Sequence, residues 1–527
     1  MRGAVAILRA GRTLLLAAAV AVPCAAQSAT DNASAEVELG RAIYEGRTPL
    51  KFANQGAVPG VTGVDARGCV ACHRHSGMGN FEGGLAVPPI AGPTLFRALD
   101  RDTSHFFAAA ARHRVRPAYD QASLVRLLRT GMAPDGVAMH PAMPRYTIGD
   151  DEAGNLVSYL RQLSASSPTG IDADNVRIAT VTTPDADPLR SEAMLKTLRR
   201  FIEQKNGQSR HEAQRAQQSA KTREMVMYRK YRVWQLDHWA LQGPASTWAA
   251  QLDAFQKARP VFALVGGSGR AQWEPVDAFC KRARTPCLLP LVDAGAAESG
   301  GADFYSLHYH AGMAHDAALA ARQLVKQGVQ RVQFWFQAED DELARQVMSA
   351  LLREGLRLVG DDDARAQAVV SVLPLEAHRQ RRSAALNLSL VWLPGLQRLD
   401  AEVLRQATAG QAHGWIVSPL RQGTDLDRVL ARTRAWQRAQ GLEALPAEVS
   451  AAALQAATVL GEGLAHLDFG FTPEYLLELL EHGLENVVPW SPFPRLSIGP
   501  DQRIAVKGSQ LGEVRNGAVT WRWQALR

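Results

Sequence analysis

The residues with the most specific chemistry in this chain are the two cysteines and the histidine of Cys69-Val70-Ala71-Cys72-His73. Two thiols at this spacing can add to the two vinyl groups of one porphyrin, and the adjacent histidine then lies beneath the iron. A zinc half-site and a thioredoxin-like redox pair also use C-x-x-C. The further ligands of a zinc site are missing at short spacing, as is the strand that precedes a redox pair. The run therefore predicts one covalently attached haem.

An iron held by His73 needs a second axial ligand, and Met143 in Ala142-Met143-Pro144-Arg145-Tyr146 is the best candidate. A thioether is a soft, neutral ligand that favours Fe(II) and leaves no open position for oxygen chemistry. The competing ligands are Met78, Met132, Met139 and His140. This pair of ligands predicts an electron carrier with no catalytic residue, and not an enzyme.

Helices on both sides of this run are expected to position the haem ligands. Residues 37–44 have helical spacing, and the stretch 46–93 that follows is rich in Gly and Pro and has no period. Such a stretch would be a long loop without a cofactor to fold around. Further helices are expected over 121–130 and from Asp150 or Asp151 to Leu163. Residues 36–165 therefore predict one domain, followed by a linker over 166–175.

The amino-terminal segment is expected to direct export. Arg2, Arg9 and Arg12 precede an apolar run from Leu14 to Val22, and small residues follow it. This is the pattern of a cleavable signal peptide, here over residues 1–26, and the apolar run is too short to span a bilayer. We expect a periplasmic protein without a transmembrane segment in the mature chain.

Residues 176–527 have a different texture, in which apolar strand-like runs alternate with amphipathic helices. This alternation predicts parallel sheets with helices on both faces, which is an α/β architecture. Strands are expected at 176–181, 233–241, 261–265, 287–291, 332–336, 368–373, 388–393 and 415–417. Helices are expected at 248–257, 275–283, 313–326 and 340–354, and hairpins at 499–501 and 516–517.

Charge and the remaining cysteines narrow the class of protein further. The formal net charge is +7, and without the three arginines of the expected signal peptide it is +4, which is too small to argue for nucleic acid. Cys280 and Cys287 form a second local pair near a helix end and a strand start. A disulfide is conceivable there, and two buried thiols are the alternative.

Residues 36–165 resemble class I cytochromes c in the order of their parts: the helix 37–44, the haem motif, the helix 121–130, Met143-Pro144 and the helix 156–163. The resemblance implies an all-α domain with one haem c, attached through Cys69 and Cys72 and ligated by His73 and Met143. It also implies that a proline-containing loop offers a backbone carbonyl to Nδ1 of the histidine. Residues 88–93 (Pro-Pro-Ile-Ala-Gly-Pro) look like that loop, although the sequence does not show which carbonyl is used.

Residues 176–527 resemble the periplasmic substrate-binding proteins of branched-chain amino-acid transporters, a two-lobed type I fold. The resemblance lies in Gly266-Gly267-Ser268-Gly269 after an expected strand, in Phe304-Tyr305-Ser306 and in the hairpin 493–497. It implies that Ser268 contacts the carboxylate of a small ligand, with Tyr305 or Tyr309 as further contacts. A simple flexible turn is the alternative for the glycine-rich segment, and the opening Thr182-Thr183-Pro184-Asp185 departs from the family.

Together these features predict a periplasmic electron carrier with an appended solute-binding-like domain. The expected redox partners are a periplasmic dehydrogenase and another cytochrome or oxidase, and the family analogy suggests a quinoprotein alcohol dehydrogenase as donor. A ligand-binding sensor with an accessory haem domain is the alternative. A haem peroxidase would need an open iron position and is the weakest hypothesis.

Overall fold

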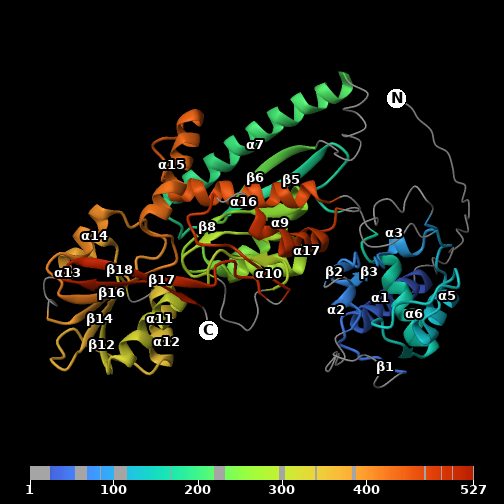
Figure 1. Cartoon of the computed structure of the whole chain (residues 1–527), viewed down its shortest axis with the longest axis horizontal. Coiled ribbons are helices and arrows are strands. Elements are labelled where there is room, and N and C mark those ends of the chain that lie inside the picture. Colours follow the sequence, from blue (N-terminus) through green and yellow to red (C-terminus); the bar gives the residue numbers. More distant parts are fainter. Residues whose placement is uncertain are drawn as a thin grey trace, which may run out of the picture. The chain divides into compact units, whose positions relative to one another are not determined.

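The computed structural model describes residues 24–53, 68–82, 85–99, 115–165, 168–218, 232–295, 303–338, 341–382, 387–467, 471–487, 490–500 and 502–525. The chain divides into two compact units, Met1–Ser166 and Ser167–Arg527, whose elements are labelled in Figure 1. Nearly all of the expected signal peptide lies outside the described residues. Within the described ranges, no helix combines the length and the apolar character needed to cross a membrane.

The first unit is built on the contact between helices α1 (Cys24–Tyr44) and α6 (Asp150–Gln162). A Cβ on Gly40 would lie 2.0 Å from a backbone carbonyl oxygen of α6, so the close approach requires glycine there. The rings of Tyr44 and Tyr159 extend the contact at a centroid distance of 5.2 Å. This helix pair anchors the apolar core of the unit.

Helix α5 (Gln121–Thr130) begins and ends where its sequence dictates. Asp120 caps it by accepting a hydrogen bond from the backbone N–H of Ser123 at 2.8 Å. Gly131 ends it in the left-handed conformation that glycine adopts without strain. Leu124 and Leu127 are buried on the inner face of the helix. The apolar period of the sequence therefore marks the face that packs against the core.

The other elements of the first unit are short. They are α2 (Val70–His73), α3 (Gly92–Leu95), and two antiparallel pairs, β1 (Lys51–Phe52) with β4 (Tyr146–Thr147) and β2 (Asn80–Glu82) with β3 (Leu85–Val87). The described part of the unit is therefore mainly helical, and it also contains two small ribbons that the sequence did not indicate.

The second unit has two lobes, and the first lobe is a parallel sheet. Its strands are β5 (Asn175–Thr182), β6 (Val233–Ala240), β7 (Ala263–Val265), β8 (Ser268–Gly269), β9 (Cys287–Leu288), β10 (Leu291–Val292) and β11 (Ser306–Leu307). Strands β8 and β10 continue β7 and β9 beyond a kink, so the sheet runs β6, β5, β7/β8, β9/β10, β11. Counted along the chain, this is the doubly wound order second-first-third-fourth-fifth.

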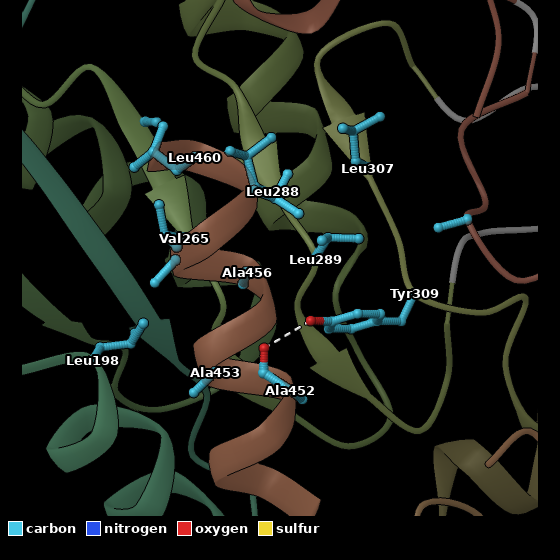
Figure 2. Close-up of a cluster of buried hydrophobic side chains, with 14 of the residues drawn as sticks. Leu198, Val265, Leu288, Leu289, Leu307, Tyr309, Ala452, Ala453, Ala456 and Leu460 are labelled. Atoms are coloured by element: carbon cyan, nitrogen blue, oxygen red, sulfur yellow. Dashed lines mark hydrogen bonds between the residues drawn. The ribbon is translucent and has the colours of Figure 1, made fainter. Parts of the chain in front are cut away.

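Helices cover both faces of this sheet (Figure 1). They are α7 (Pro188–Gln218), the 3-10 turn η2 (Ala245–Thr247), α9 (Trp248–Ala258), α10 (Glu274–Ala283), α16 (Ala447–Ala465), α17 (Pro473–Gly483) and the 3-10 turn η4 (Leu484–Asn486). Helix α16 is rich in alanine, which lets its backbone approach the sheet closely, and Figure 2 shows Ala452, Ala453 and Ala456 facing Leu288 and its neighbours.

The second lobe repeats the same strand order and adds an antiparallel edge. Its strands are β12 (Arg331–Trp335), β13 (Arg357–Val359), β14 (Ala368–Ser371), β15 (Ser389–Trp392), β16 (His413–Ser418), β17 (Gly508–Arg515) and β18 (Ala518–Ala525), in the order β13-β12-β14-β15-β16-β17-β18. Its helices are α11 (Met313–Lys326), α12 (Glu342–Arg353), α13 (Leu375–Arg382) and α14 (Ala401–Thr408), and α15 (Gly423–Gln440) leads back to α16. Asn516 and Gly517 turn the final hairpin with φ angles of 49° and 79°.

Segments that connect the two lobes lie side by side. The backbone N–H of His308 donates to the carbonyl of Arg503 at 2.9 Å, and the N–H of Ala505 donates to the carbonyl of His308 at 2.8 Å. Arg421, in the connection between β16 and α15, donates its backbone N–H to the carbonyl of Pro492 at 2.8 Å. The lobes are therefore joined through a hydrogen-bonded set of connections.

The α/β expectation for residues 176–527 is confirmed, since each predicted strand and helix has a counterpart in this unit. The run 287–291 is split into β9 and β10 because Leu289 takes a left-handed φ of 57°. Cys280 and Cys287 form a disulfide between α10 and β9, with their Cα atoms 6.2 Å apart. The pairing that the sequence left open is thus resolved.

Candidate functional site

Helix α2 gathers the two thiols and the histidine on a single turn. Cys69 is its N-cap, and the backbone N–H of His73 donates to the carbonyl of Cys69 at 2.8 Å. Side chains three and four positions apart on a helix lie on one face, so this turn places Cys69 on the same face as Cys72 and on the same face as His73. Neither cysteine is part of a disulfide, and Cys72 is exposed while Cys69 is partly buried. Burial raises the pKa of the Cys69 thiol to about 12, so this sulfur keeps its proton.

The orientation of the His73 ring is fixed by the proline-containing loop. Nδ1 of His73 lies 2.9 Å from the carbonyl oxygen of Pro88. A carbonyl only accepts hydrogen bonds, so Nδ1 carries the proton and Nε2 keeps the lone pair that a metal needs. Burial of the ring lowers its pKa to about 4, with the Pro88 contact opposing this effect. His73 is therefore a neutral imidazole with a defined tautomer.

Glycines hold this loop close to α2. The backbone N–H of Gly79 donates to the carbonyl of His73 at 3.2 Å, and the N–H groups of Ile90 and Ala91 donate to the carbonyl of Gly77 at 2.7 and 3.0 Å. Both glycines have positive φ, and a Cβ on Gly79 would lie 2.1 Å from a carbonyl oxygen of β3. The loop that orients His73 thus depends on residues without side chains.

Of the methionines considered as ligands, two pack toward the same core as the haem motif. The side chains of Met139 and Met143 are partly buried against the cluster that also contacts Cys69. Met132 is 38% exposed, and His140 is exposed. The structure therefore brings Met143 and Met139 to the core that carries the motif, and it does not separate these two candidates further.

Arg145 organises the methionine loop, a role that the sequence analysis missed. Its guanidinium donates to the carbonyl of Met143 and, at 3.1 Å, to the carbonyl of Met139. Gly131, which ends α5, makes room for it, because a Cβ there would lie 2.0 Å from Nε of Arg145. The sequence does contain two features that could have indicated this role. Arg145 lies two residues after Met143, and Gly131 ends the preceding helix.

Tyr146 connects the methionine loop to the haem motif. It lies in β4, where it pairs with Phe52 of β1, and the two rings are 5.6 Å apart. Burial raises the pKa of its phenol, and Cys69 and Cys72, when ionised, raise it further. The phenol is thus within electrostatic reach of both thiols, so the strand that follows Met143 lies near them.

The residues present fit a haem. Two thiols outside any disulfide, an imidazole nitrogen with an available lone pair and soft thioether sulfurs form a suitable donor set. Several apolar side chains pack against the same core as these donors while remaining only partly buried: Val70, Ile90, Phe96, Val125 and Tyr146. Such side chains can pack against the apolar faces of a porphyrin.

Comparison with known proteins identifies the class of the first unit. Residues 57–164 match the family model of cytochrome c, so the chain contains a cytochrome c domain. Haem c is the cofactor that this match supports, and redox proteins are the partners that it implies. No curated protein matches the chain.

The second unit is similar to solved substrate-binding proteins. A substrate-binding periplasmic protein from Ralstonia solanacearum is 16% identical and covers 66% of this chain and 100% of its own, with a TM-score of 0.48. A branched-chain amino acid transporter substrate-binding protein from Streptococcus pneumoniae, in complex with isoleucine, is 13% identical and covers 67% and 100%, with a TM-score of 0.45. An ABC transporter substrate-binding protein from Desulfitobacterium hafniense, in complex with Leu, is 15% identical and covers 66% and 100%, with a TM-score of 0.42. The two-lobed α/β fold rests on the strand order itself.

The ligand contacts expected in the second unit do not come together in the structure. Ser268 is fully buried, and among the described residues its hydroxyl has no hydrogen-bond partner. Tyr305 precedes β11, at the opposite end of the strands, where its hydroxyl donates to Glu474 at 2.6 Å and accepts from Arg284 at 2.9 Å. Tyr309 is buried in the core and donates to the carbonyl of Ala452 at 2.7 Å (Figure 2).

The segment Gly266-Gly267-Ser268-Gly269 is a packed kink. A Cβ on Gly266 would lie 2.6 Å from the sulfur of Met194 in α7, and one on Gly267 would lie 2.7 Å from the ring of Trp273. Both glycines have positive φ, at 60° and 121°. The glycines are required by close packing, so their presence in the sequence is not by itself evidence of a ligand.

Proposed function

We propose that this chain is an exported, periplasmic c-type cytochrome that carries one haem on Cys69 and Cys72 and transfers electrons. The observation that carries the proposal is the arrangement on α2, where two cysteines that form no disulfide share one turn with an imidazole whose Nδ1 contacts the carbonyl of Pro88. A haem bound there supplies a one-electron Fe(III)/Fe(II) couple. The match of residues 57–164 to cytochrome c supports the same conclusion.

The side chains have separate roles in this proposal. Cys69 and Cys72 would hold the porphyrin through thioether bonds, each formed by addition of an S–H bond across one vinyl group. His73, whose ring is held by the carbonyl of Pro88, would bind the iron through Nε2. Met143, on a loop that Arg145 holds through two carbonyls, would bind it through its sulfur. An iron held by both side chains would have no open position, which suits an electron carrier and not a haem enzyme.

The proposed route runs from a periplasmic dehydrogenase, of the quinoprotein type suggested by family analogy, to another cytochrome or a terminal oxidase. No acid, base or nucleophile is needed for this role, because the transferred species is an electron. The second unit is an accessory module of the carrier.

Haem attachment is tested on the mature protein, produced with a cytochrome maturation system, by haem staining of a denaturing gel and by intact mass. The wild type should stain and carry the mass of one haem, and Cys69→Ala with Cys72→Ala should abolish both signals. Cys280→Ala with Cys287→Ala is the matched control, since it also removes two cysteines but should keep the haem. A wild type without covalent haem, or with two haems, would contradict the proposal.

A further inference from the structure

The strand order of the first lobe reverses between β5 and β7, and the carboxyl ends of these two strands form one edge of the sheet. In a doubly wound sheet, ligands bind at the carboxyl ends of the strands where the order reverses, which here lies between these two strands. Two loops meet at this edge, one following β5 and one following β8. They are joined by the backbone N–H of Thr183, which donates to the carbonyl of Ser268 at 3.0 Å.

At this edge of the sheet, a carboxylate of the chain itself accepts hydrogen bonds from the available donors. Asp185 accepts a hydrogen bond from the hydroxyl of Thr183 through Oδ1, and one from the backbone N–H of Ala271 at 2.8 Å through Oδ2. A hydroxyl and a loop N–H are the donors that such an edge offers to an anionic ligand. Thr183 is 2% exposed and Ala271 is 6% exposed, so both donors are buried, while Asp185 itself is partly exposed.

The second lobe closes over the same loop. Arg270 forms a two-pronged ion pair with Asp341, with N–O distances of 2.9 and 2.7 Å. The Asp341 side chain is only 5% exposed, and it also caps α12 by accepting from two backbone N–H groups. Gln346 of α12 donates to the carbonyl of Ala271 at 3.1 Å. Ala271 therefore binds Asp185 through its N–H and the second lobe through its carbonyl.

Apolar packing and a second contact complete the closure. The side chain of Ala271 belongs to the core cluster of the second lobe, where it joins Leu343 and Val347 of α12. Beyond β10, the backbone N–H of Met313 donates to the carbonyl of Asp293 at 2.8 Å. The lobes are thus held together by a dry contact as well as by the ion pair.

We infer that Asp185 is a built-in ligand, whose carboxylate fills the anion position of the first lobe and keeps the two lobes of the second unit closed without a solute. The inference concerns this unit alone and goes beyond the proposed electron transfer. A free amino acid would have to displace a carboxylate that is covalently part of the chain and therefore present at high effective concentration. The second unit is accordingly a preformed rigid module that does not respond to small carboxylates.

Chemical rescue tests this inference on the full-length, haem-loaded protein. Asp185→Ala should lower the calorimetric unfolding midpoint of the second unit by about 3–8 °C, because the buried N–H of Ala271 loses its acceptor and the hydroxyl of Thr183 keeps only the carbonyl of Ser268 at 3.4 Å. Sodium acetate, compared with sodium chloride at equal ionic strength, should restore part of this loss in Asp185→Ala. It should leave the wild type and the control Asp253→Ala, an exposed carboxylate of α9, unchanged.

A measurement on the wild type keeps the inference testable even if Asp185→Ala fails to fold. Small-angle scattering should give the same radius of gyration with and without leucine or acetate. Contraction of the wild type on adding leucine, or stabilisation of the wild type by acetate as large as that of Asp185→Ala, would overturn the inference. So would an Asp185→Ala protein that unfolds at the wild-type midpoint.

Discussion

At the scale of single residues, backbone carbonyls decide what the side chains of the haem site can do. The carbonyl of Pro88 sets the tautomer of His73, and the carbonyls of Met139 and Met143 are held by one guanidinium. The sequence identified the side-chain types, because C-x-x-C-H has few chemical uses. It could not identify the carbonyls that hold these side chains, since every residue has a carbonyl. Only the folded loops show which carbonyls lie close to His73 and Arg145.

The Arg145 contacts predict a specific effect on the methionine loop. Arg145→Leu should loosen the loop and lower the free energy of unfolding of the first unit by about 1–3 kcal/mol, since two buried carbonyls lose a charged donor. The thioether charge-transfer band of the ferric haem should weaken in parallel. Arg126→Leu, which removes an exposed arginine of α5, is the control and should leave the band unchanged. An equal loss in both variants would argue against the Arg145 role.

Asp316 in α11 predicts a pH-dependent stability of the second unit. Burial raises the pKa of its carboxyl to about 7, while the hydroxyl of Ser509 donates to it and opposes the shift. A raised folded-state pKa contributes stability that is present at low pH and is lost as the pH rises through 7. The titration of this residue alone should lower the free energy of unfolding by about 2–3 kcal/mol between pH 5 and pH 8.

Denaturant unfolding of the wild type and Asp316→Asn at the two pH values measures this cost. The asparagine stays neutral, so the difference between the proteins should change by that amount between pH 5 and pH 8. A difference that does not vary with pH would show that Asp316 does not titrate in this range.

At the level of secondary structure, hydrophobic period predicted most of the parallel strands and several helices of the second unit, but it did not predict α15, α16 and α17 or the kinks between strands. Met313–Lys326 was predicted with its observed bounds, because its apolar face is continuous and a glycine precedes it. The run from Cys287 to Leu291 was predicted as one strand, and Leu289 breaks it by adopting a positive φ. Such a break depends on tertiary packing, so it cannot be predicted from a run of apolar residues.

The disulfide between α10 and β9 is an element-scale link with a measurable contribution. Replacing both Cys280 and Cys287 with alanine should lower the free energy of unfolding by about 2–3 kcal/mol, because the denatured chain regains the entropy of a short closed loop. Alkylation of the denatured, unreduced wild type followed by mass spectrometry should find neither cysteine modified. Modification of both would contradict the link.

At the scale of the whole molecule, the chain joins a cytochrome c domain to a two-lobed α/β unit. The sequence predicted both architectures, because each has a strong signature: a haem motif in one and strand-helix alternation in the other. It did not predict the role of Asp185, since a carboxylate after a strand is common. One of its partners, Thr183, is a near neighbour, but the other, Ala271, lies 86 residues away along the chain. The closed second unit therefore emerged from the structure alone.

We propose that a haem iron bound here would be ligated by both His73 and Met143, which suits it to carry electrons. The ferric and ferrous visible spectra of the mature protein are the most direct measurement of this ligation, with Met143→Ala and Met139→Ala as paired variants. We predict a low-spin wild type whose thioether charge-transfer band is lost in Met143→Ala and retained in Met139→Ala, with covalent haem in all three. A high-spin wild type, or a band that survives in Met143→Ala, would contradict the account.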